Sequence, residues 1–405
     1  MKQTTGNIDF ILFGEGNYNT LGVLHCMAER GIEVFLLLVG SGKQCLQGNI
    51  IEYSRFANYG HNVQTEKEGV EWILANKMLF PEGTVIYPTS DTTESLLDIH
   101  YDNLIKHYNF PNCGYQGAVT LLMEKDEQIS KARSFNVRVL KSLYTHNSNF
   151  DHNSVVYPCM VKPLKSITGS KGDMKVCNSR KELDEALSSA KNTSEFIVQQ
   201  YINNEADLLF LGIALPNEDI WMPSLVKKPG VSPTGEYTNA IVTTAVAEHL
   251  PELKDVKHFI ASLHYVGPFS IEFGLEKGKN YFFEINLRND GTSHYPLASG
   301  VNIPYVYYRA CKGELTLDDM NYEQGEFPMI DEVLDIRRIL SREISFSKWW
   351  HFFRTAKAYR YYTTSDKRIA IALIPMFVSR LCSKIWRAIS SIHPTSSRIR
   401  GLFAK

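Results

Sequence analysis

FSIEFGLEKGKNYFFEINLR, residues 269–288, carries the most informative pattern of the chain. Two apolar runs lie on either side of Gly278 and predict a β-hairpin that turns at this glycine. Side chains alternate between the two faces of a strand, so every second residue of the second run shares a face. In a register centred on the glycine, with Glu272 opposite Glu284, this polar face carries Glu272, Glu284, Asn286 and Arg288.

The two glutamates repel each other, because carboxylates across a strand pair lie about 5 Å apart. A divalent cation between them removes the repulsion. Two carboxylates and the amide oxygen of Asn286 are hard ligands that suit Mg²⁺, with Mn²⁺ as the alternative ion. Arg288 can then hold a phosphoryl oxygen. The competing interpretation is a solvated hairpin with two surface glutamates, and the flanking apolar residues disfavour it.

Residues 8–118 alternate short apolar runs with longer amphipathic ones, which predicts a parallel sheet covered by helices. We expect strands at 8–13, 34–39 and 85–87, and helices at 20–30, 70–79 and 92–108. Open parallel sheets bind ligands in the loops at their strand ends, so Asn17 and Asp91 are expected to face a substrate.

Two glycine patterns in this segment do not complete a nucleotide motif. After Gly14 and Gly16, Asn19 stands where a dinucleotide-binding fingerprint needs its third glycine. In the second pattern, Leu37 and Gln44 replace the first glycine and the Ser or Thr of a P-loop. Both patterns therefore fail as phosphate-binding motifs.

Residues 119–330 change to an α+β pattern, and this region carries the predicted chemistry. We expect a helix at 126–142, strands at 155–162, 196–202 and 208–215, and a helix from the capping box at 179–182 to about 191. Lys162 ends the first strand, and a loop of Gly, Ser, Thr and Lys follows. Ammonium and backbone N–H groups in such a loop can bind polyphosphate, with a plain surface loop as the alternative.

The order of these motifs resembles the ATP-grasp superfamily, and within it carboxylate-amine ligases of the carbamoyl-phosphate synthase and D-aspartate ligase kind. The resemblance covers about residues 8–320, and the hairpin is its most specific part. It implies an ATP-grasp fold of α/β and α+β class with an N-terminal Rossmann-like pre-ATP-grasp domain. It also implies an ATP-dependent ligase that passes an acyl phosphate to an amine. The glycine-rich lid of biotin carboxylases is not found, which disfavours bicarbonate chemistry.

The same resemblance implies a role for each matching residue. The nucleotide phosphates are expected to contact Lys125, Lys162, Gly169, Ser170, Lys171 and Gly172. Adenine and ribose are expected to contact Gln199, Gln200, Tyr201, Ile202 and Glu205. Magnesium is expected on Glu272, Glu284 and Asn286, with Arg288 and Lys162 as the catalytic side chains. Ser293 and His294 follow the hairpin and are expected to border the substrate, although such a turn can also need them for shape alone.

Four segments follow from these boundaries. Residues 1–118 form the pre-ATP-grasp domain and residues 119–195 the small ATP-grasp subdomain with a phosphate lid. Residues 196–325 form the large subdomain with the metal hairpin, and residues 326–405 a basic, amphipathic C-terminal extension. A chain of 405 residues has room for several domains in contact.

The C-terminal extension is basic, with 15 Lys and Arg against 5 Asp and Glu over residues 331–405, while the whole chain has a net charge of −1. No nucleic-acid-binding motif accompanies this charge. An apolar stripe predicts a helix that lies on an anionic membrane through residues 365–390. The alternative is that the stripe packs on the ligase body or on a second subunit, as in a homodimer. The stripe consists of Leu373, Phe377, Leu381, Ile385 and Ile389.

Seven scattered cysteines without a C-x-x-C pair predict reduced thiols, and the short apolar run at 8–13 lacks the core of a signal peptide. We therefore expect a cytoplasmic protein, peripheral to the membrane if the tail binds it. Three functions stay open. The first is a carboxylate-amine ligase acting on small molecules or on a cell-envelope or polysaccharide precursor. The second is an ATP-grasp phosphotransferase or synthetase with a non-amine acceptor, and the third is a non-catalytic, membrane-associated nucleotide-binding protein.

Overall fold

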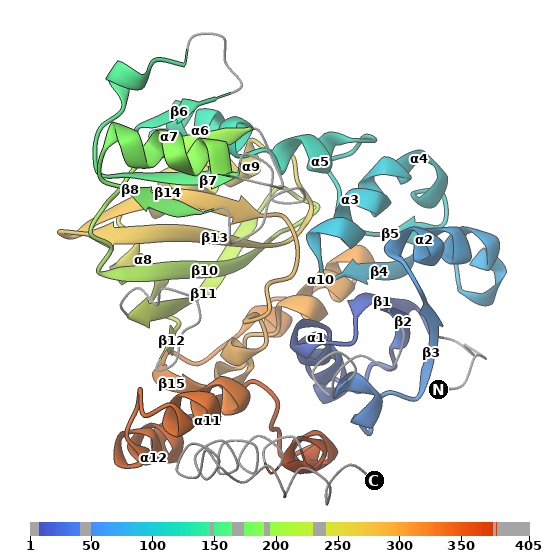
Figure 1. Ribbon diagram of the computed structural model, residues 1–405. Coiled ribbons are helices and arrows are strands. Elements are labelled where there is room, and N and C mark those ends of the chain that lie inside the picture. The colour runs from blue at the N-terminus through green and yellow to red at the C-terminus, as the bar shows by residue number, and fades with distance from the viewer. Residues whose placement is uncertain are drawn as a thin grey trace, which may run out of the picture.

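The computed structural model describes residues 8–40, 50–145, 150–163, 174–189, 195–229, 240–375 and 378. Within them the chain forms three sheets, and each is built from a different part of the sequence (Figure 1). Their strand orders are β3-β2-β1-β4-β5, β6-β9-β7-β8 and β14-β13-β10-β11-β12-β15-β16. Short 3₁₀ helices cover Ile50–Tyr53, Lys77–Leu79, His152–Ser154, Tyr295–Ser299 and Asp318–Met320.

The N-terminal sheet is entirely parallel, as the alternation of strands and helices predicts. Its strands are β1 (Phe10–Glu15), β2 (Phe35–Val39), β3 (Tyr59–Val63), β4 (Thr84–Pro88) and β5 (Tyr108–Asn109). The helices of this domain are α1 (Tyr18–Glu29), α2 (Glu66–Ala75), α3 (Asp91–Ile99) and α4 (Tyr101–Leu104).

Two features of this domain differ from the expectation. The single helix expected at 92–108 is wrong. Helix α3 ends at Ile99 with His100 as its cap, and the short α4 follows it. Tyr108 then pairs with Thr84 as part of edge strand β5. Strand β3 was not predicted. Its five residues bury only Gly60 and Val63 and so lack the continuous apolar run of a central parallel strand.

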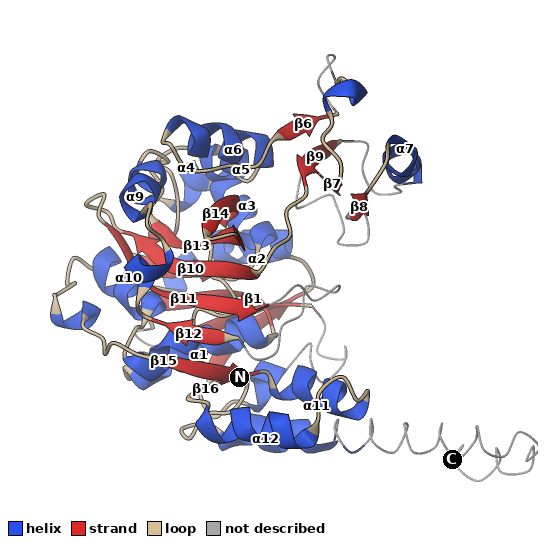
Figure 2. Ribbon diagram, turned by 90° about the vertical axis from the view of Figure 1, so that its left-hand side faces the viewer, coloured by secondary structure: helices blue, strands red, loops and turns tan. Residues whose placement is uncertain are grey.

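The small sheet is antiparallel, and α5 (Ala118–Leu122) and α6 (Lys125–Ser134) precede it. It contains β6 (Ser142–Tyr144), β7 (Cys159–Pro163), β8 (Lys175–Cys177) and β9 (Phe196–Gln200), with α7 (Arg180–Ser189) before β9. Because β9 pairs with β6 and β7, this sheet extends past the boundary expected at residue 195. Figure 2 shows it standing beside the large sheet.

The helix expected at 126–142 is too long. Helix α6 stops at Ser134, where Asn136 takes a left-handed conformation with φ 61°. The N–H of Val137 reaches the carbonyl of Ala132 at 3.0 Å, and the N–H of Asn136 reaches that of Arg133 at 3.2 Å. This is a Schellman cap, which closes a helix and frees the chain to turn into β6.

The large sheet receives strands from both the predicted large subdomain and the C-terminal extension. Its strands are β10 (Ala206–Ala214), β11 (Ile220–Pro229), β12 (Ile241–Thr243), β13 (Gly267–Glu276), β14 (Lys279–Asn286), β15 (Glu326–Ile330) and β16 (Ala358–Tyr359). Its helices are α8 (Val246–His249), α9 (Leu253–Ala261), α10 (Ile303–Cys311), α11 (Glu332–Leu340) and α12 (Phe346–Thr355).

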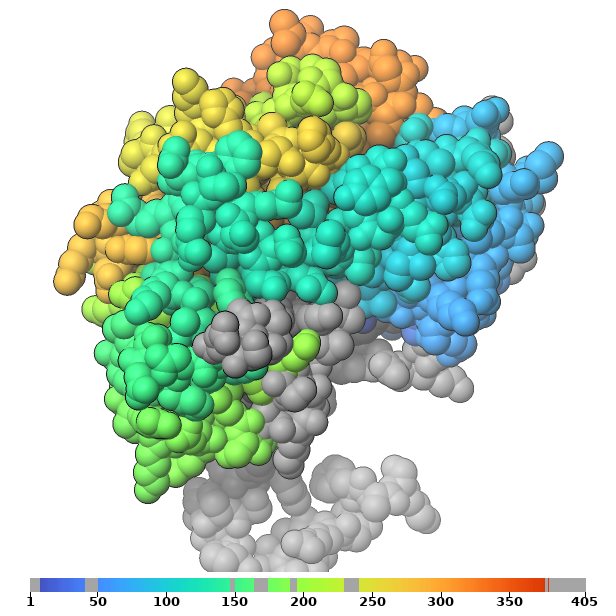
Figure 3. Space-filling model, turned by 90° about the horizontal axis from the view of Figure 1, so that it is seen from above, coloured from blue at the N-terminus to red at the C-terminus, as the bar shows by residue number. Residues whose placement is uncertain are grey.

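Strand β10 shows why the large sheet needs cover on both faces. Leu208 and Phe210 pack with α6 and α9, while Leu209 and Leu211 belong to a second core shared with the N-terminal domain and α10. Glu272 pairs with Leu209 across β10 and β13 and so lies on the second of these faces. In Figure 3 the N-terminal domain (blue) and the small-sheet region (green) occupy opposite sides of the molecule.

The C-terminal extension is anchored in the protein body. Ile369 and Leu373 are fully buried in the core that the N-terminal domain and the large sheet share. Leu373 opens the predicted membrane stripe, so the prediction is wrong for this residue. Ile371 and Ile374, in the same helical segment (367–375), are exposed, and so is Val378. The other stripe residues lie outside the described chain, and within the described part no helix is long and apolar enough to cross a membrane.

Candidate nucleotide and metal site

The hairpin β13–β14 has the pairing that the sequence predicts, with Glu272 opposite Glu284. The turn differs in detail. It has two residues, Lys277 and Gly278, both with positive φ, and one extra residue follows in β14 before Glu284. This bulge brings Glu284 opposite Glu272, and it directs the side chains of two neighbouring phenylalanines into different surroundings. Phe282 is buried in the core, while the ring of Phe283 lies 5.0 Å from Nζ of Lys162.

Three lysines from three elements surround the two glutamates. Lys125 at the start of α6 lies 3.4 Å from Glu284, and Lys228 in β11 lies 3.8 Å from Glu272. Lys162 at the end of β7 donates to Oε1 of Gln199 at 3.2 Å. The site therefore gathers positive charge around a carboxylate pair, as binding of a polyphosphate and a divalent cation requires.

The protonation equilibria of these groups reflect burial first and then their neighbours. Burial raises the pKa of Glu272 to about 7, although Lys228 opposes the change. Burial acts in the same direction on Glu284, but Lys125 and Lys162 outweigh it and lower the pKa of that carboxyl. Burial also lowers the pKa of Lys162, although the negative charge of Glu284 acts in the opposite direction. The two facing carboxyls therefore differ, because lysine neighbours lower the pKa of Glu284 while burial raises that of Glu272.

The donors fit a magnesium ion that is completed by nucleotide oxygens. No cluster of three His, Cys, Asp or Glu side chains occurs in the described part of the chain, and the amide of Asn286 lies beside the two carboxylates on the hairpin as a further oxygen donor. Nδ2 of Asn286 points to Oγ of Ser270 at 3.4 Å, which leaves Oδ1 available. A small cavity lies between this amide and the carboxylate of Glu284, and Asp91 and Lys125 also line it.

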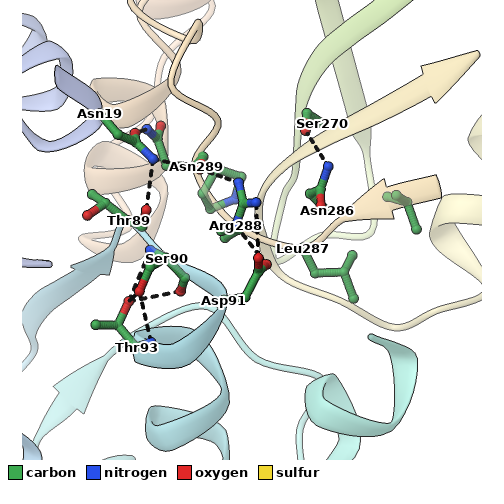
Figure 4. Close-up of polar contacts among 12 residues, drawn as sticks. Asn19, Thr89, Ser90, Asp91, Thr93, Ser270, Asn286, Leu287, Arg288 and Asn289 are labelled. Carbon is green, nitrogen blue, oxygen red and sulfur yellow. Dashed lines mark hydrogen bonds and ion pairs between the residues drawn. The ribbon is translucent and has the colours of Figure 1, made fainter. Parts of the chain in front are cut away.

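Arg288 links the hairpin to the N-terminal domain (Figure 4). Its Nε donates to Oδ1 of Asp91 at 2.7 Å and its Nη2 to Oδ2 at 3.2 Å. The next residue, Asn289, is buried and accepts from the hydroxyl of Tyr87 at 3.0 Å. Asn19 donates to the carbonyl of Thr89 at 2.8 Å and contacts the same asparagine. The first turn of α1, the loop after β4 and the residues just after β14 therefore form one connected wall.

Three further residues expected at the substrate are engaged within the protein. Asn17 caps α1 by accepting from the N–H groups of its first turn. Ser293 is buried and donates to Oδ1 of Asn289 at 2.7 Å. His294 lies 3.3 Å from the carbonyl of Tyr359 and packs on Gly22, and burial lowers its pKa to about 3. The imidazole is therefore neutral at physiological pH.

The expected adenine segment lies at the carboxyl end of β9, an inner strand of the small sheet. Gln199 is buried between Lys162 and Ser142. The N–H groups of Gln200 and Tyr201 donate to the carbonyls of Lys141 and Pro158 at 2.8 and 3.1 Å, and Ile202 is buried. The carboxylate of Glu205 accepts from the N–H of Lys277 at 2.9 Å, so it also supports the hairpin turn. The phosphate-loop residues Gly169, Ser170, Lys171 and Gly172 lie outside the described residues.

Lys228 is the site residue that the sequence analysis missed. It ends the apolar run Leu225-Val226 in β11, two strands away from Glu272 in the sheet order. A lysine that terminates a buried strand is the same signal that identified Lys162. This signal alone does not place Lys228 beside Glu272, because the pairing of β10 with both β11 and β13 is a long-range feature.

Comparison with known proteins agrees with this geometry. Residues 123–302 match the ATP-grasp domain family. No curated protein sequence matches the chain.

Several solved structures share the fold. An ADP complex of purK, N5-carboxyaminoimidazole ribonucleotide synthetase, has a TM-score of 0.63 and 15% identity over 84% of this chain and 87% of that one. Biotin carboxylase from Campylobacter jejuni gives 0.61 and 15% over 79% and 74%. L-amino acid ligase from Bacillus licheniformis gives 0.59 and 15% over 80% and 78%.

Proposed function

Because the chain carries an ATP-grasp domain over residues 123–302, we propose that it is an ATP-dependent carboxylate-amine ligase. The reaction proposed here forms an amide through an acyl phosphate. The observation that carries the proposal is the facing pair Glu272 and Glu284, surrounded by Lys125, Lys162 and Lys228. The carboxylates suit Mg²⁺ and the surrounding lysines suit the phosphates of ATP. Together these groups fit MgATP better than they fit the metal ion or the nucleotide alone.

The protein residues have distinct roles in this proposal. Glu272, Glu284 and Asn286 hold Mg²⁺, which supplies charge neutralisation at the nucleotide oxygens. Lys162 and Lys125 contact the phosphates, and Arg288 stabilises the phosphoryl group as it moves. Asp91 positions Arg288 through its two contacts. The segment at 199–202 and Glu205 bind the nucleoside, with the loop at 169–172 covering the phosphates.

Two displacements complete the proposed reaction. An oxygen of the substrate carboxylate attacks the γ-phosphorus, the bond from that phosphorus to the bridging oxygen breaks, and ADP leaves. The nitrogen of the amine then attacks the acyl carbon, inorganic phosphate leaves, and the nitrogen loses a proton. The similarity in fold to an L-amino acid ligase supports an amine as the acceptor.

The test is release of ADP and phosphate from MgATP by the full chain, with a panel of amino acids and dicarboxylates, with and without hydroxylamine. Hydroxylamine converts an acyl phosphate to a hydroxamate, so a hydroxamate with one acid supports the proposal and identifies that acid. A phosphorylated product without a hydroxamate would show a phosphotransferase. No turnover with small molecules or lipid-linked precursors would contradict an enzymatic role.

We further propose that the ligase works at a membrane surface on an envelope or polysaccharide precursor. Apolar side chains are exposed on α12 and on the helical residues 367–375, which lie at the same end of the molecule as orange and red ribbon (Figure 1). These exposed residues are Phe346, Trp350, Ile371 and Ile374, and Val378 is exposed as well. Basic residues of the extension accompany them, and this combination suits an anionic lipid surface.

A further inference from the structure

Arg360 of the C-terminal extension enters the wall of the ligase site. Its backbone is fixed by two separate devices. The N–H of Arg360 donates to the carbonyl of Ile330 at 2.9 Å, next to the strand pair β15–β16. The carboxylate of Glu332 accepts from the N–H groups of Arg360, Tyr361 and Tyr362 at 3.0, 3.1 and 2.7 Å. A chain held in this way directs the arginine side chain inward.

The guanidinium group lies between two tyrosines of different elements. Its carbon is 4.3 Å from the centre of the Tyr18 ring, at the start of α1. Its Nε donates to the hydroxyl of Tyr295 at 2.9 Å, and its Nη1 lies 2.6 Å from Asp331. Stacking on an aromatic ring and pairing at one end hold a guanidinium in a fixed orientation.

This position borders the face that carries the metal ligands. Tyr18 begins α1 directly after the loop that follows β1, and Tyr295 begins the 3₁₀ helix that follows the hairpin. The two segments touch, since a Cβ at Gly291 would come within 2.4 Å of the Tyr18 ring. The guanidinium therefore lies where the start of α1 meets the segment that follows the hairpin.

The arginine retains binding capacity after its contacts are counted. A guanidinium carries five N–H donors, and Tyr295 and Asp331 account for two. Among the described residues none accepts from Nη2, and the side chain is 20% exposed. A planar edge with free donors matches a carboxylate, which can accept two parallel hydrogen bonds.

We propose that Arg360 is a substrate-binding residue that recognises a carboxylate of the substrate other than the one that is phosphorylated. This inference rests on the proposed ligase function and narrows its substrates to anionic amino acids or dicarboxylic acids. The C-terminal extension then contributes to specificity as well as to location. In this proposal Tyr18 and Asp331 position the guanidinium, whereas Lys228 and Arg288 act near the carboxylate that is phosphorylated.

The test is calorimetric titration of the full chain with succinate, aspartate and glutamate, in the presence of saturating MgADP. Wild type, Arg360→Lys, Arg360→Gln and the control Arg354→Gln are compared, because Arg354 is an exposed arginine of α12. We expect wild type and the control to bind at least one of these acids equally. Arg360→Gln should bind it about tenfold more weakly, since a charge-assisted contact is lost, and Arg360→Lys should lie between them. Thermal unfolding of each variant checks the fold.

Further arms separate the possible outcomes. Inorganic phosphate is the probe for the γ-phosphate position, and its affinity should not change in Arg360→Gln. Equal affinity of Arg360→Gln and wild type for the acids overturns the proposal, as does a wild type that binds none at millimolar concentration. MgADP titration reports on the proposed function separately. If wild type does not bind MgADP, the ligase proposal fails, while acid titration without nucleotide still reports on Arg360.

Discussion

Arg288 and Asp91 form a two-point ion pair between residues that are 197 positions apart in the sequence (Figure 4). Asp91 is the first residue of α3, directly after its capping residue Ser90. Arg288 is 18% exposed and Asp91 33% exposed. The pair therefore fixes the end of the metal hairpin to a helix of the N-terminal domain, and the geometry of the site depends on how these two domains meet.

Asp91→Asn is expected to lower both stability and activity. The amide cannot replace a two-point carboxylate contact, and Arg288 loses its charged partner. We expect a loss of about 1.5–3 kcal/mol in the free energy of unfolding by urea. We also expect a fall in kcat for ADP release, because Arg288 is no longer oriented. Asp102→Asn, at an exposed position in α4, is the control and should match wild type. An unchanged kcat in Asp91→Asn would argue against the positioning role.

Glu284→Gln should abolish MgATP turnover without unfolding the protein. The amide keeps the shape of the side chain but removes the charge that binds the cation and pairs with Lys125. Loss of a catalytic metal ligand should reduce ADP release by at least about 100-fold. Circular dichroism checks the fold, and Glu248→Gln on the surface of α8 serves as control. Wild-type turnover in Glu284→Gln would refute the metal assignment.

Glu94 should make the stability of the protein depend on pH. Its carboxyl is fully buried, and neither oxygen has a hydrogen-bond partner among the described residues. Burial, followed by the charges of Asp98 and Asp91, raises its pKa well above the usual value. A raised pKa means that the stabilising protonated form is fully present below the unfolded pKa of about 4.3 and is lost as pH rises through the folded pKa.

Glu94→Gln removes this titration. Between pH 4.3 and the raised pKa, the free energy of unfolding of wild type should fall relative to the variant by about 1.4 kcal/mol per pH unit. Urea unfolding at several pH values measures the slope. Glu82→Gln, at an exposed position, should leave the slope as in wild type. Parallel curves for wild type and Glu94→Gln would show that the carboxyl is ionised in the folded state.

The membrane proposal predicts that Ile371→Asp with Ile374→Asp weakens binding to phosphatidylserine vesicles. Burying one such side chain is worth about 1.5–3 kcal/mol, so the double variant should lose at least about tenfold in affinity. Leu317→Asp, which alters a still more exposed apolar residue elsewhere, is the control. Co-sedimentation measures the affinity, and binding should fall with added salt.

The choice of deletion matters for the same experiment. Removing residues 379–405 leaves Asp366, Ile369 and Leu373 in place, whereas removing residues 365–405 would also delete these buried side chains. If the shorter deletion and the double variant both sediment like wild type, the protein does not bind anionic membranes through this surface.

Local features of the site could be predicted from the sequence, and long-range contacts could not. The facing glutamates follow from alternation along one hairpin, because they are twelve positions apart and the turn is marked by Gly278. The bulge at Phe283 could not be predicted even there. A two-residue turn with a bulge and a turn centred on one glycine both place Glu272 opposite Glu284, so the pairing does not distinguish them.

Lys228, Arg360 and the pairing of Arg288 with Asp91 depend on how separate segments meet. Alternation and periodicity describe a single element, and they do not specify which strand lies beside which. Leu373 illustrates the same limit. Its stripe is amphipathic in sequence, but which side of that helix faces the protein is decided by the core into which Ile369 and Leu373 pack.

The anchoring of the C-terminal extension has a consequence for synthesis of the protein. Asp366 is fully buried against His25 at 3.3 Å and against Ser54, so a late segment completes the packing of the first domain. Chains emerge from the ribosome at about 5–20 residues per second, with the N-terminal parts folding first. The hairpin β13–β14 is therefore synthesised before Arg360 and Asp366. A chain released between these points contains the proposed metal ligands but lacks the segment that completes the packing of the N-terminal domain.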